Sequence, residues 1–244
     1  MSAKLEVEGI SKHFRGVKAL QDVTLSIESS QLLGLIGPNG SGKSTLVNCV
    51  TGYFKPDTGR VIAMGSKISG LPSHKIFRLG IARTFQTPQL YPELNAKQHL
   101  RVATIWQHDT KDGREKEFDE LLNFLKLEGR EKIPASLLTH FEQRKLEIGT
   151  RLAISPKFLL LDEPAAGLSP EEIDELLNMI KSLREKGMGL LVIEHTMRVI
   201  VTLSDTVKVL SQGKIIASGS PQEITSSPAV VEAFLGRWKP KEKQ

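Results

Sequence analysis

Hydrophobic and polar residues alternate with a period of two in the first part of the chain. Residues 5–10 and residues 23–27 both show this alternation, which is typical of strands buried on one face. Residues 32–36 are apolar throughout, as expected for a strand that is covered on both faces. A further short run at residues 60–64 follows a Pro-Asp-Thr-Gly turn. These segments predict a small antiparallel sheet beside one buried strand.

The pattern changes to a helical period in the middle of the chain. Residues 87–150 contain no convincing strand pattern. One amphipathic helix face is predicted by the spacing i, i+3, i+4 and i+7 of Phe118, Leu121, Leu122 and Leu125. We therefore expect a helical insertion that is closed by Pro156.

The last third of the chain alternates buried strands with helices. Residues 158–161 and 190–193 are short apolar runs, each typical of a parallel strand inside an α/β sheet. Between them, Ser169, Pro170 and Glu172 form the pattern of a capped helix start. The remaining expected elements are a hairpin with strands at residues 207–210 and 214–217, a short helix near residues 230–235 and a polar, basic tail at residues 237–244.

The composition is that of an ordinary folded protein, with 244 residues, of which 39% are hydrophobic and 25% are charged. The single cysteine, Cys49, excludes a disulfide framework and suits a reducing compartment. No N-terminal signal pattern is visible, and no apolar run approaches the roughly 18 residues that a membrane span needs. At a membrane, a partner would therefore hold this chain. The net charge of +5 is spread out and no basic-aromatic cluster accompanies it, so no nucleic-acid partner is expected.

Residues 37–45 carry the most specific motif in the chain. They match G-x-x-x-x-G-K-[ST] between a buried strand and a helix-compatible segment, a context that argues against an incidental glycine-rich turn. The glycines let the backbone wrap around a polyphosphate, and the helix N-terminus favours its negative charge. Lys43 is expected to reach the β- and γ-phosphates, and the Ser44 hydroxyl to bind Mg²⁺. The predicted nucleotide-binding residues are Gly37, Pro38, Asn39, Gly40, Ser41, Gly42, Lys43, Ser44 and Thr45.

Polar side chains follow both of the later buried strands. Asp162 stands where a phosphate-loop fold needs a second magnesium anchor, and Glu163 can polarise an attacking water as general base. A solvated turn or a helix cap is the alternative for such an acidic pair. His195 can contact the γ-phosphate from the opposite side, although a histidine after a strand is more often structural.

The order and spacing of these motifs resemble those of the ATP-binding cassette (ABC) transporter ATPases. The resemblance includes the phosphate loop, Gln86, the Asp162-Glu163 pair and His195, and it covers nearly the whole chain. It implies an α/β fold: a P-loop NTPase core with a mainly parallel central sheet, an N-terminal antiparallel β subdomain and a helical insertion. The implied division is a single ABC ATPase domain at residues 1–236, with its core at residues 1–86 and 151–236 and its helical subdomain at about residues 87–150.

The resemblance also implies roles for individual residues. Phe14, at a place more often held by tyrosine, would stack on adenine, and Val17 would pack near the ribose. The implied catalytic residues are Glu163, His195 and Gln86. The implied magnesium ligands and sensors are Ser44, Gln86 and Asp162. The surface expected to receive a short helix from a membrane subunit carries Leu90, Tyr91 and Leu94.

One segment departs from the family pattern. These ATPases act as head-to-tail dimers, and each subunit offers a Leu-Ser-Gly-Gly-Gln signature to the nucleotide of the other. At that place this chain reads Leu-Thr-His-Phe-Glu, residues 138–142. Thr139 keeps a hydroxyl donor, but Phe141 replaces a glycine and Glu142 brings a carboxylate close to phosphate. This departure favours a heterodimer with a second ABC ATPase subunit; in the alternative, a slow homodimer, Phe141→Gly should change little.

The predicted function is ATP hydrolysis that powers uptake of a small polar solute. Residues 83–90 and 230–236 look like the ATPases of branched-chain amino-acid uptake. The implied cofactors are ATP and Mg²⁺, and the implied partners are two transmembrane permease subunits and, indirectly, a solute-binding protein. The chain would lie at the cytoplasmic face of the membrane. The alternatives are an ATPase of lipid or lipopolysaccharide export, one of urea uptake, or a nucleotide-dependent switch without a transport role.

Overall fold

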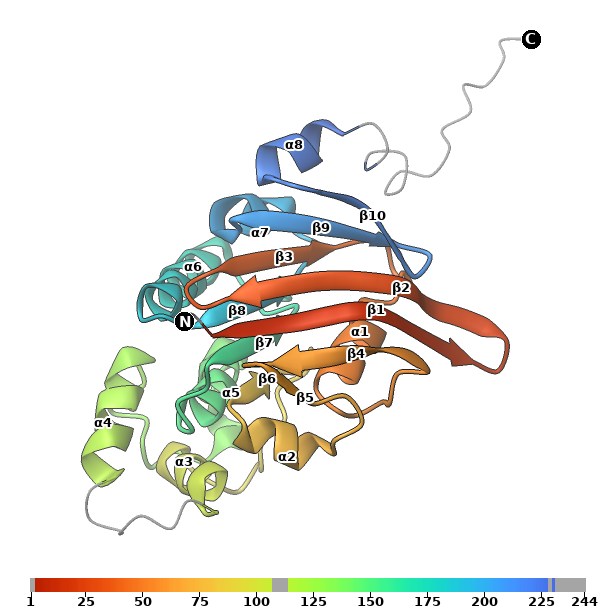
Figure 1. Ribbon diagram of the computed structural model, residues 1–244. Coiled ribbons are helices and arrows are strands. Elements are labelled where there is room, and N and C mark those ends of the chain that lie inside the picture. Colours follow the sequence, from red (N-terminus) through yellow and green to blue (C-terminus); the bar gives the residue numbers. More distant parts are fainter. Residues whose placement is uncertain (1–2, 107–113, 228–229, 231–244) are drawn as a thin grey trace.

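Two β-sheets of different kinds form the centre of the molecule (Figure 1). The computed structural model describes residues 3–106, 114–227 and 230. The first sheet is antiparallel, in the order β2-β1-β4-β5, with β1 Lys4–Phe14, β2 Val17–Glu28, β4 Thr58–Ala63 and β5 Ser66–Lys67. The second is mainly parallel, in the order β10-β9-β3-β8-β7-β6, with β3 Leu32–Ile36, β6 Ile81–Arg83, β7 Phe158–Asp162, β8 Gly189–Ile193, β9 Thr206–Ser211 and β10 Lys214–Gly219.

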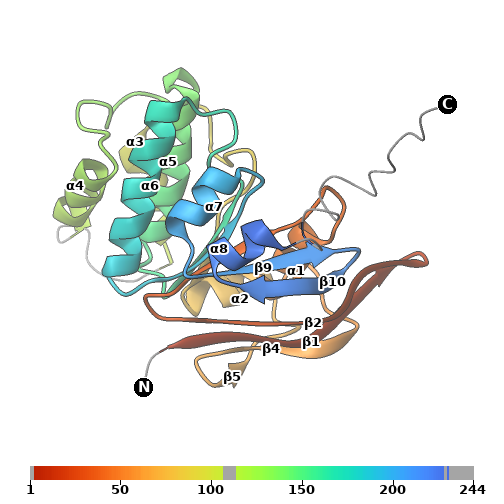
Figure 2. The ribbon, with the colours of Figure 1, turned by 90° about the horizontal axis from the view of Figure 1, so that it is seen from above.

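Helices complete the layers, as the view from above shows (Figure 2). The antiparallel sheet covers one side of the mainly parallel sheet, and most helices cover the other. The described helices are α1 Lys43–Val50, α2 Ser73–Arg78, α3 Ala96–Thr104, α4 Arg114–Phe124, α5 His140–Leu152, α6 Pro170–Glu185, α7 Met197–Leu203 and α8 Pro221–Ser226. None of these helices is long and apolar enough to cross a bilayer.

The central strands have two buried faces because a separate hydrophobic core lies on each side. In β3, Leu33 and Leu35 pack with the antiparallel sheet and with α1. Leu32 and Ile36 pack instead with the helices α3, α5, α6 and α7 on the opposite side. This two-sided burial explains why residues 32–36 are apolar throughout, as the sequence predicts for such a strand.

The long strands, the phosphate-loop helix, the strand pair β7 and β8 and the final hairpin are confirmed, with bounds that differ by a few residues. Helix α6 begins at Ser169, whose hydroxyl accepts from Glu172 N while the Glu172 carboxylate accepts from Ser169 N. Five short elements were not predicted from the sequence: α2, β5, β6, α7 and α8. They contain two to seven residues each, which is too few for a periodic pattern to identify them. The helix expected near residues 230–235 falls, after its first residue, outside the described residues.

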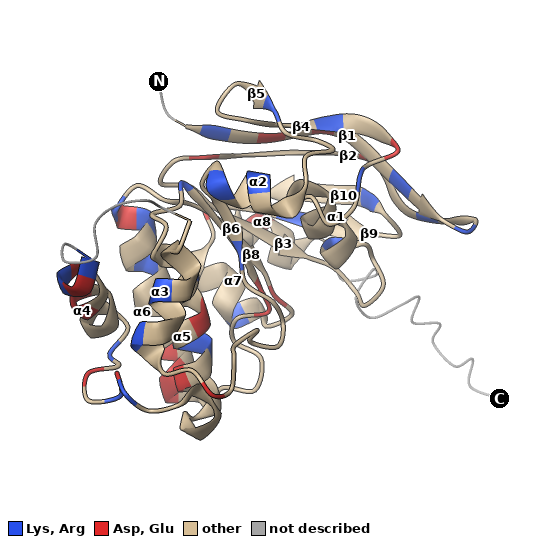
Figure 3. Ribbon diagram, turned by 90° about the horizontal axis from the view of Figure 1, so that it is seen from below, with Lys and Arg blue, Asp and Glu red and all other residues tan. Residues whose placement is uncertain are grey.

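Helices α3, α4 and α5 occupy the region where the helical insertion is expected. Phe118 and Leu122 of α4 are buried, whereas Leu125 is buried just beyond the end of that helix. Ion pairs join α3 to α4, with Lys97 Nζ 2.6 Å from Asp119 Oδ1 and Arg101 Nη2 2.7 Å from Glu115 Oε1. Figure 3 shows acidic and basic residues interspersed on α4. Such exposed pairs contribute little each, so the buried apolar face holds α4 in place.

Helix α5 starts inside the segment that departs from the family signature. The Thr139 hydroxyl accepts from Glu142 N, and the Glu142 carboxylate accepts from Thr139 N at 2.8 Å. A second Glu142 oxygen pairs with Arg130 Nε at 3.0 Å. Phe141 is 6% exposed, and the Lys145 ammonium lies 4.8 Å from its ring centroid. The sequence-based view of this segment therefore needs a correction: Phe141 is a core residue, and Glu142 is a capping residue with a cationic neighbour.

The substitution Phe141→Gly should destabilise the protein strongly. Truncating a buried Phe costs about 3–5 kcal/mol, and glycine in a helix costs about 1 kcal/mol more than alanine. Urea unfolding measures the difference. The matched control is His140→Gly, because the neighbouring His140 is exposed and should lose no more than about 1 kcal/mol. Equal losses in the two variants would contradict the core role of Phe141.

Candidate nucleotide-binding site

The loop between β3 and α1 can be made only with glycine at two positions. A Cβ on Gly37 would lie 2.0 Å from Leu210 O, and one on Gly42 would lie 2.4 Å from Ala19 O. Gly42 also has a φ of +111°, in the left-handed region that favours glycine. The loop therefore packs against β9 and β2 without side chains between the backbones. This packing leaves the concave side of the loop open for a ligand.

Lys43 lies within this loop and has only carbonyl partners there. Its ammonium donates to Gly37 O at 2.7 Å and to Pro38 O at 3.1 Å. Burial lowers the pKa of Lys43, while Glu163 and Asp162 act in the opposite direction. The Ser41 hydroxyl is buried and has no partner among the described residues. A phosphate group in the loop would supply acceptors for both side chains.

A cavity of about 480 Å³ lies over the loop. Its lining comes from the phosphate loop, from β2 and from the ends of the central strands. Of the predicted residues, those that line it are Val17, Asn39, Gly40, Ser41, Gly42, Lys43, Ser44, Thr45, Glu163 and His195. Gln212, from the turn of the hairpin, also lines it and was not predicted. The cavity thus brings together residues more than 170 positions apart in the sequence.

Asp162 lies at the carboxyl end of β7 and is 7% exposed. Its backbone N–H donates to the Thr84 hydroxyl at 3.3 Å, and its Oδ2 accepts from Arg83 Nη2 at 3.4 Å. Burial raises the pKa of this carboxyl, and the Arg83 guanidinium partly offsets that effect. The Asp162 carboxyl is therefore a buried oxygen group close enough to Lys43 to act on its pKa.

Glu163 is flanked by the two other predicted catalytic side chains. Gln86 Nε2 donates to Glu163 Oε2 at 2.7 Å, and His195 Nε2 lies 2.8 Å from Glu163 Oε1. The Glu163 backbone has a φ of +48°, uncommon for a residue with a Cβ, and its N–H donates to Ile193 O. The structure thus brings Gln86, Glu163 and His195 into one cluster. In this arrangement a carboxylate at the cavity wall is fixed by two nitrogen donors.

Other predicted residues lie away from this cavity. Phe14 is 37% exposed at the end of β1, and its ring packs edge-on against Phe54 with centroids 5.1 Å apart. Thr139 lies at the start of α5, where its hydroxyl is used in capping that helix. Neither residue lines the cavity of its own chain.

Sequence reasoning missed the buried polar residues that hold the site's loops. Glu194 is 2% exposed and accepts from Ala165 N at 2.8 Å and from His195 N at 3.2 Å. Burial raises the pKa of the Glu194 carboxyl. Its place directly after a buried strand is the same signal that identified Asp162, so it was available in the sequence.

The segment after β6 is attached to α5 by two buried charged side chains. Arg144 is 1% exposed and donates to Phe85 O at 2.9 Å and to Gln86 O at 2.8 Å. Glu147 Oε1 accepts from Phe85 N at 3.2 Å and from Gln89 N at 3.3 Å. The position of Gln86 in the site therefore depends on α5, the helix that begins at Thr139.

The next residues of this segment only partly match the exposed apolar surface that was expected. Leu90 packs against the hydrophobic core and Leu94 is half-buried, whereas Tyr91 is 60% exposed. His99 holds Tyr91 in place, because its buried Nε2 accepts from Tyr91 N at 2.9 Å. His99 Nδ1 lies 2.9 Å from Asn95 O, which makes Nδ1 the protonated nitrogen.

The oxygen donors near the loop fit a magnesium ion that is bound together with phosphate. Mg²⁺ is usually held by one or two protein oxygens and by substrate phosphates rather than by an all-protein cage. The Ser44 hydroxyl and the Asp162 carboxylate are such oxygens. The part of the chain that the structure describes contains no group of three or more His, Cys, Asp or Glu that could hold a metal alone.

Comparison with known protein families identifies the architecture. The family model described as "ABC transporter" matches residues 20–166, which include the phosphate loop and Asp162-Glu163. The chain belongs to the ABC transporter ATPase family. A second model, "Branched-chain amino acid ATP-binding cassette transporter", matches residues 214–237. As in its homologues, the chain is an ATP-hydrolysing subunit of a transporter.

Relatives match this ABC ATPase over nearly its whole length. The "High-affinity branched-chain amino acid transport ATP-binding protein BraF" of Pseudomonas aeruginosa is 38% identical, covering 95% of this chain and 97% of its own. The "Lipopolysaccharide export system ATP-binding protein LptB" of Acidithiobacillus ferridurans is 31% identical, covering 97% and 98%. A crystal structure of a nucleotide-free ATP-binding cassette from an ABC transporter has a TM-score of 0.87 at 33% identity, covering 97% of this chain and all of the other. The α/β fold expected from sequence is thereby confirmed.

The stability of this ABC ATPase should depend on His99 between about pH 7.5 and 5.5. Burial lowers the pKa of His99 below 6.5, so the folded state keeps it neutral while the unfolded state gains a proton as the pH falls. Native stability should thus decrease below about pH 6.5, by up to ~1.4 kcal/mol per pH unit from this group. Unfolding curves of His99→Gln should lack that part of the slope. His74→Gln, at an exposed histidine of α2, is the control; the idea fails if both variants keep the native slope.

Proposed function

We propose that this ABC ATPase binds ATP with Mg²⁺ in the cavity over the phosphate loop. The observation that carries the proposal is the cluster of Gln86, Glu163 and His195, of which Glu163 and His195 line a cavity whose floor is the phosphate loop. Ser44 and Asp162 are the residues that would hold the ion. Lys43 exchanges its carbonyl partners for phosphate oxygens when nucleotide enters.

Glu163 is the proposed general base. Gln86 and His195 each bind one of its two carboxylate oxygens. These contacts hold the carboxylate next to the space in which a water facing the loop would lie. The Glu163 carboxylate takes a proton from that water, and His195 and Lys43 are the cationic or donor groups on the phosphate side. Bound magnesium supplies charge stabilisation to the phosphates. By the family resemblance, adenine would stack on Phe14, and ribose would pack near Val17, which lines the cavity.

We propose that the natural partner is a different ABC ATPase subunit. In this chain the side chains of Thr139 and Glu142 each accept a hydrogen bond from the other residue's backbone N–H at the start of α5. Phe141 is buried in the core. The segment at residues 138–142 therefore presents no glycine backbone to a neighbour's nucleotide, and the donor that it keeps there is the O–H of Thr139. By contrast, the phosphate loop, Asp162 and Glu163 of this chain match the family pattern. One site of the heterodimer would be fully active and the other impaired.

The purified chain alone should bind ATP but hydrolyse it only at background rate, because no competent signature faces its site. Glu163→Gln defines that background, since loss of a general base lowers a rate by about 10²–10⁴-fold. Turnover of radiolabelled ATP and equilibrium ATP binding are measured in parallel. Robust turnover without a partner, lost in Glu163→Gln, would contradict the heterodimer and support a homodimer. Absence of ATP binding would contradict the site itself.

The proposed transport substrate is a branched-chain amino acid, taken up through separate permease subunits with the ATPase on the cytoplasmic face. Support comes from the P. aeruginosa relative and from the match at residues 214–237, a region outside the nucleotide site. Export of lipopolysaccharide is the second candidate, favoured by the 31% identity to the A. ferridurans protein.

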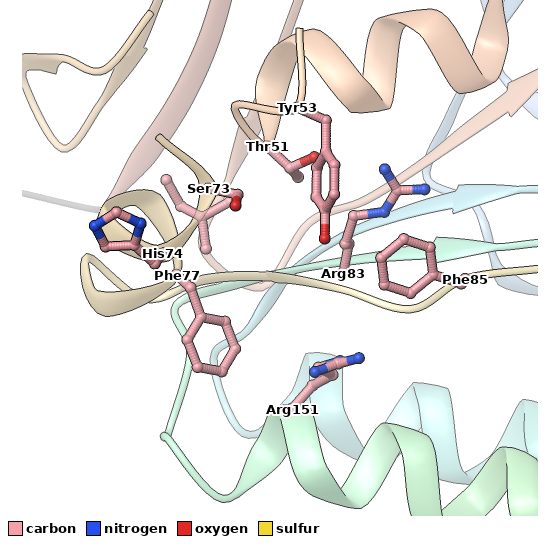
Figure 4. A pocket seen from close by; sticks show the side chains of 9 residues that line it. Thr51, Tyr53, Ser73, His74, Phe77, Arg83, Phe85 and Arg151 are labelled. Atoms are coloured by element: carbon pink, nitrogen blue, oxygen red, sulfur yellow. The ribbon is translucent and has the colours of Figure 1, made fainter. Parts of the chain in front are cut away.

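The proposed docking site for a permease segment is a pocket of about 200 Å³ beside Phe85 (Figure 4). Aromatic walls are provided by Tyr53, Phe77 and Phe85, and Arg151 also lines the pocket. The Arg151 Nε is buried and has no hydrogen-bond partner among the described residues. No carboxylate lines the pocket. The complementary partner is an apolar segment of a membrane subunit that carries an acidic side chain.

Introducing a carboxylate at the rim of this pocket should prevent docking. His74→Glu should fold, because Glu is favoured in the first turn of α2, and it should bind ATP as the native chain does. In cells it should lose co-purification of membrane subunits and most uptake of labelled leucine. Lys75→Glu, on the same helix but outside the pocket, is the matched control. Normal uptake with His74→Glu would contradict the docking site, and absence of leucine uptake with the native chain would contradict the solute.

A further inference from the structure

Arg83 lines the proposed docking pocket and also contacts Asp162, a residue of the proposed magnesium site. It is the last residue of β6 and is 8% exposed. Its guanidinium donates to the Asn48 side chain on α1, to Thr84 O at 3.3 Å and to Asp162 Oδ2 at 3.4 Å. Asn48 lies on the helix that follows the phosphate loop and Asp162 ends β7, so Arg83 joins these two elements of the nucleotide site.

Two aromatic rings of the docking pocket lie against the same guanidinium. The Phe85 centroid lies 4.4 Å from Arg83 Cζ, and the Tyr53 centroid lies 5.5 Å from it. The two rings meet edge to face at 5.9 Å. Figure 4 shows Arg83 between Tyr53 and Phe85, which line the pocket. The rings thus restrict where the guanidinium can lie.

The contact with Asp162 is the weakest of these restraints. A well-formed bond between a guanidinium and a carboxylate is about 2.7–2.9 Å long, and this one is 3.4 Å. The place of the guanidinium is therefore set by Asn48 and by the rings, and Asp162 adjusts to it. The contact uses Oδ2 and leaves Oδ1 for another ligand.

We propose that Arg83 is a positioning residue that orients the Asp162 carboxylate for a magnesium ion, with its own position set by the aromatic pocket. The inference rests on the proposed ATP and magnesium site. It has a mechanical consequence: a partner segment that enters the pocket and shifts Tyr53 or Phe85 also shifts the guanidinium that holds Asp162. Docking and metal binding would thereby share one side chain.

The test measures binding of a fluorescent ATP analogue to the full chain, first in EDTA and then over a range of Mg²⁺ concentrations. Arg83→Met should bind the analogue in EDTA within about twofold of the native chain. Its half-saturating Mg²⁺ concentration should rise about tenfold. Arg83→Lys should show a rise of at least threefold, because an ammonium cannot reach Asn48, Thr84 and Asp162 together.

Two further variants separate positioning from general packing. Arg78→Met changes an exposed arginine that lies over the ring of Trp106, outside the pocket, and should leave the Mg²⁺ dependence unchanged. Tyr53→Leu removes one ring from Arg83 and should raise the half-saturating concentration about threefold. Thermal unfolding shows whether each variant is folded. If Arg83→Met is unfolded, the Mg²⁺ dependence of Arg83→Lys and Tyr53→Leu tests the inference instead.

Three results would overturn the inference: half-saturating Mg²⁺ within twofold of native in the folded Arg83 variants, an equal shift in Arg78→Met, or no shift in Tyr53→Leu. Failure of the proposed function looks different. In that case the native chain itself would bind the analogue without any response to Mg²⁺.

Discussion

Parallel pairing of β3, β8, β7 and β6 is the constraint on which the site depends. Strands that run in the same direction end at the same edge of the sheet. In this edge the phosphate loop follows β3, His195 follows β8, Glu163 follows β7 and Gln86 follows β6. The strand order therefore places Glu163 between His195 and Gln86, and each of these contacts a different carboxylate oxygen.

Buried charged side chains attach the loops after these strands to the rest of the molecule. Arg144 and Glu147 hold both the carbonyl and the amide of Phe85 from α5, and Glu194 holds the loop that carries Ala165. A buried charge is strongly destabilising when its partner is lost, so these contacts restrict the loops to one arrangement. Because Thr139 caps α5, the segment at residues 138–142 and the Gln86 segment are attached to the same helix.

At residues 138–142, where the sequence differs from the expected family signature, the side chains make contacts within the chain itself. Glu142 is a capping residue with Arg130 beside it, and Phe141 extends the core under Lys145. The same residues thus stabilise the start of α5 at the place where the family resemblance leads one to expect a glycine. This local use of Phe141 and Glu142 is the observation behind the proposal of an unlike partner subunit.

The sequence by itself determined the phosphate loop, the buried strands, the capped start of α6 and the family, because each depends on residue types at fixed local spacing. The short elements α2, β6, α7 and α8 lacked such a spacing and are stabilised by packing. Only the tertiary structure decided where side chains point: Phe141 and Leu90 were expected at functional surfaces and lie in or against the core. The tertiary structure also showed that Arg83 contacts both the pocket and Asp162. The sequence could not show this, because contacts between residues 35 to 79 positions apart leave no periodic signal in the chain.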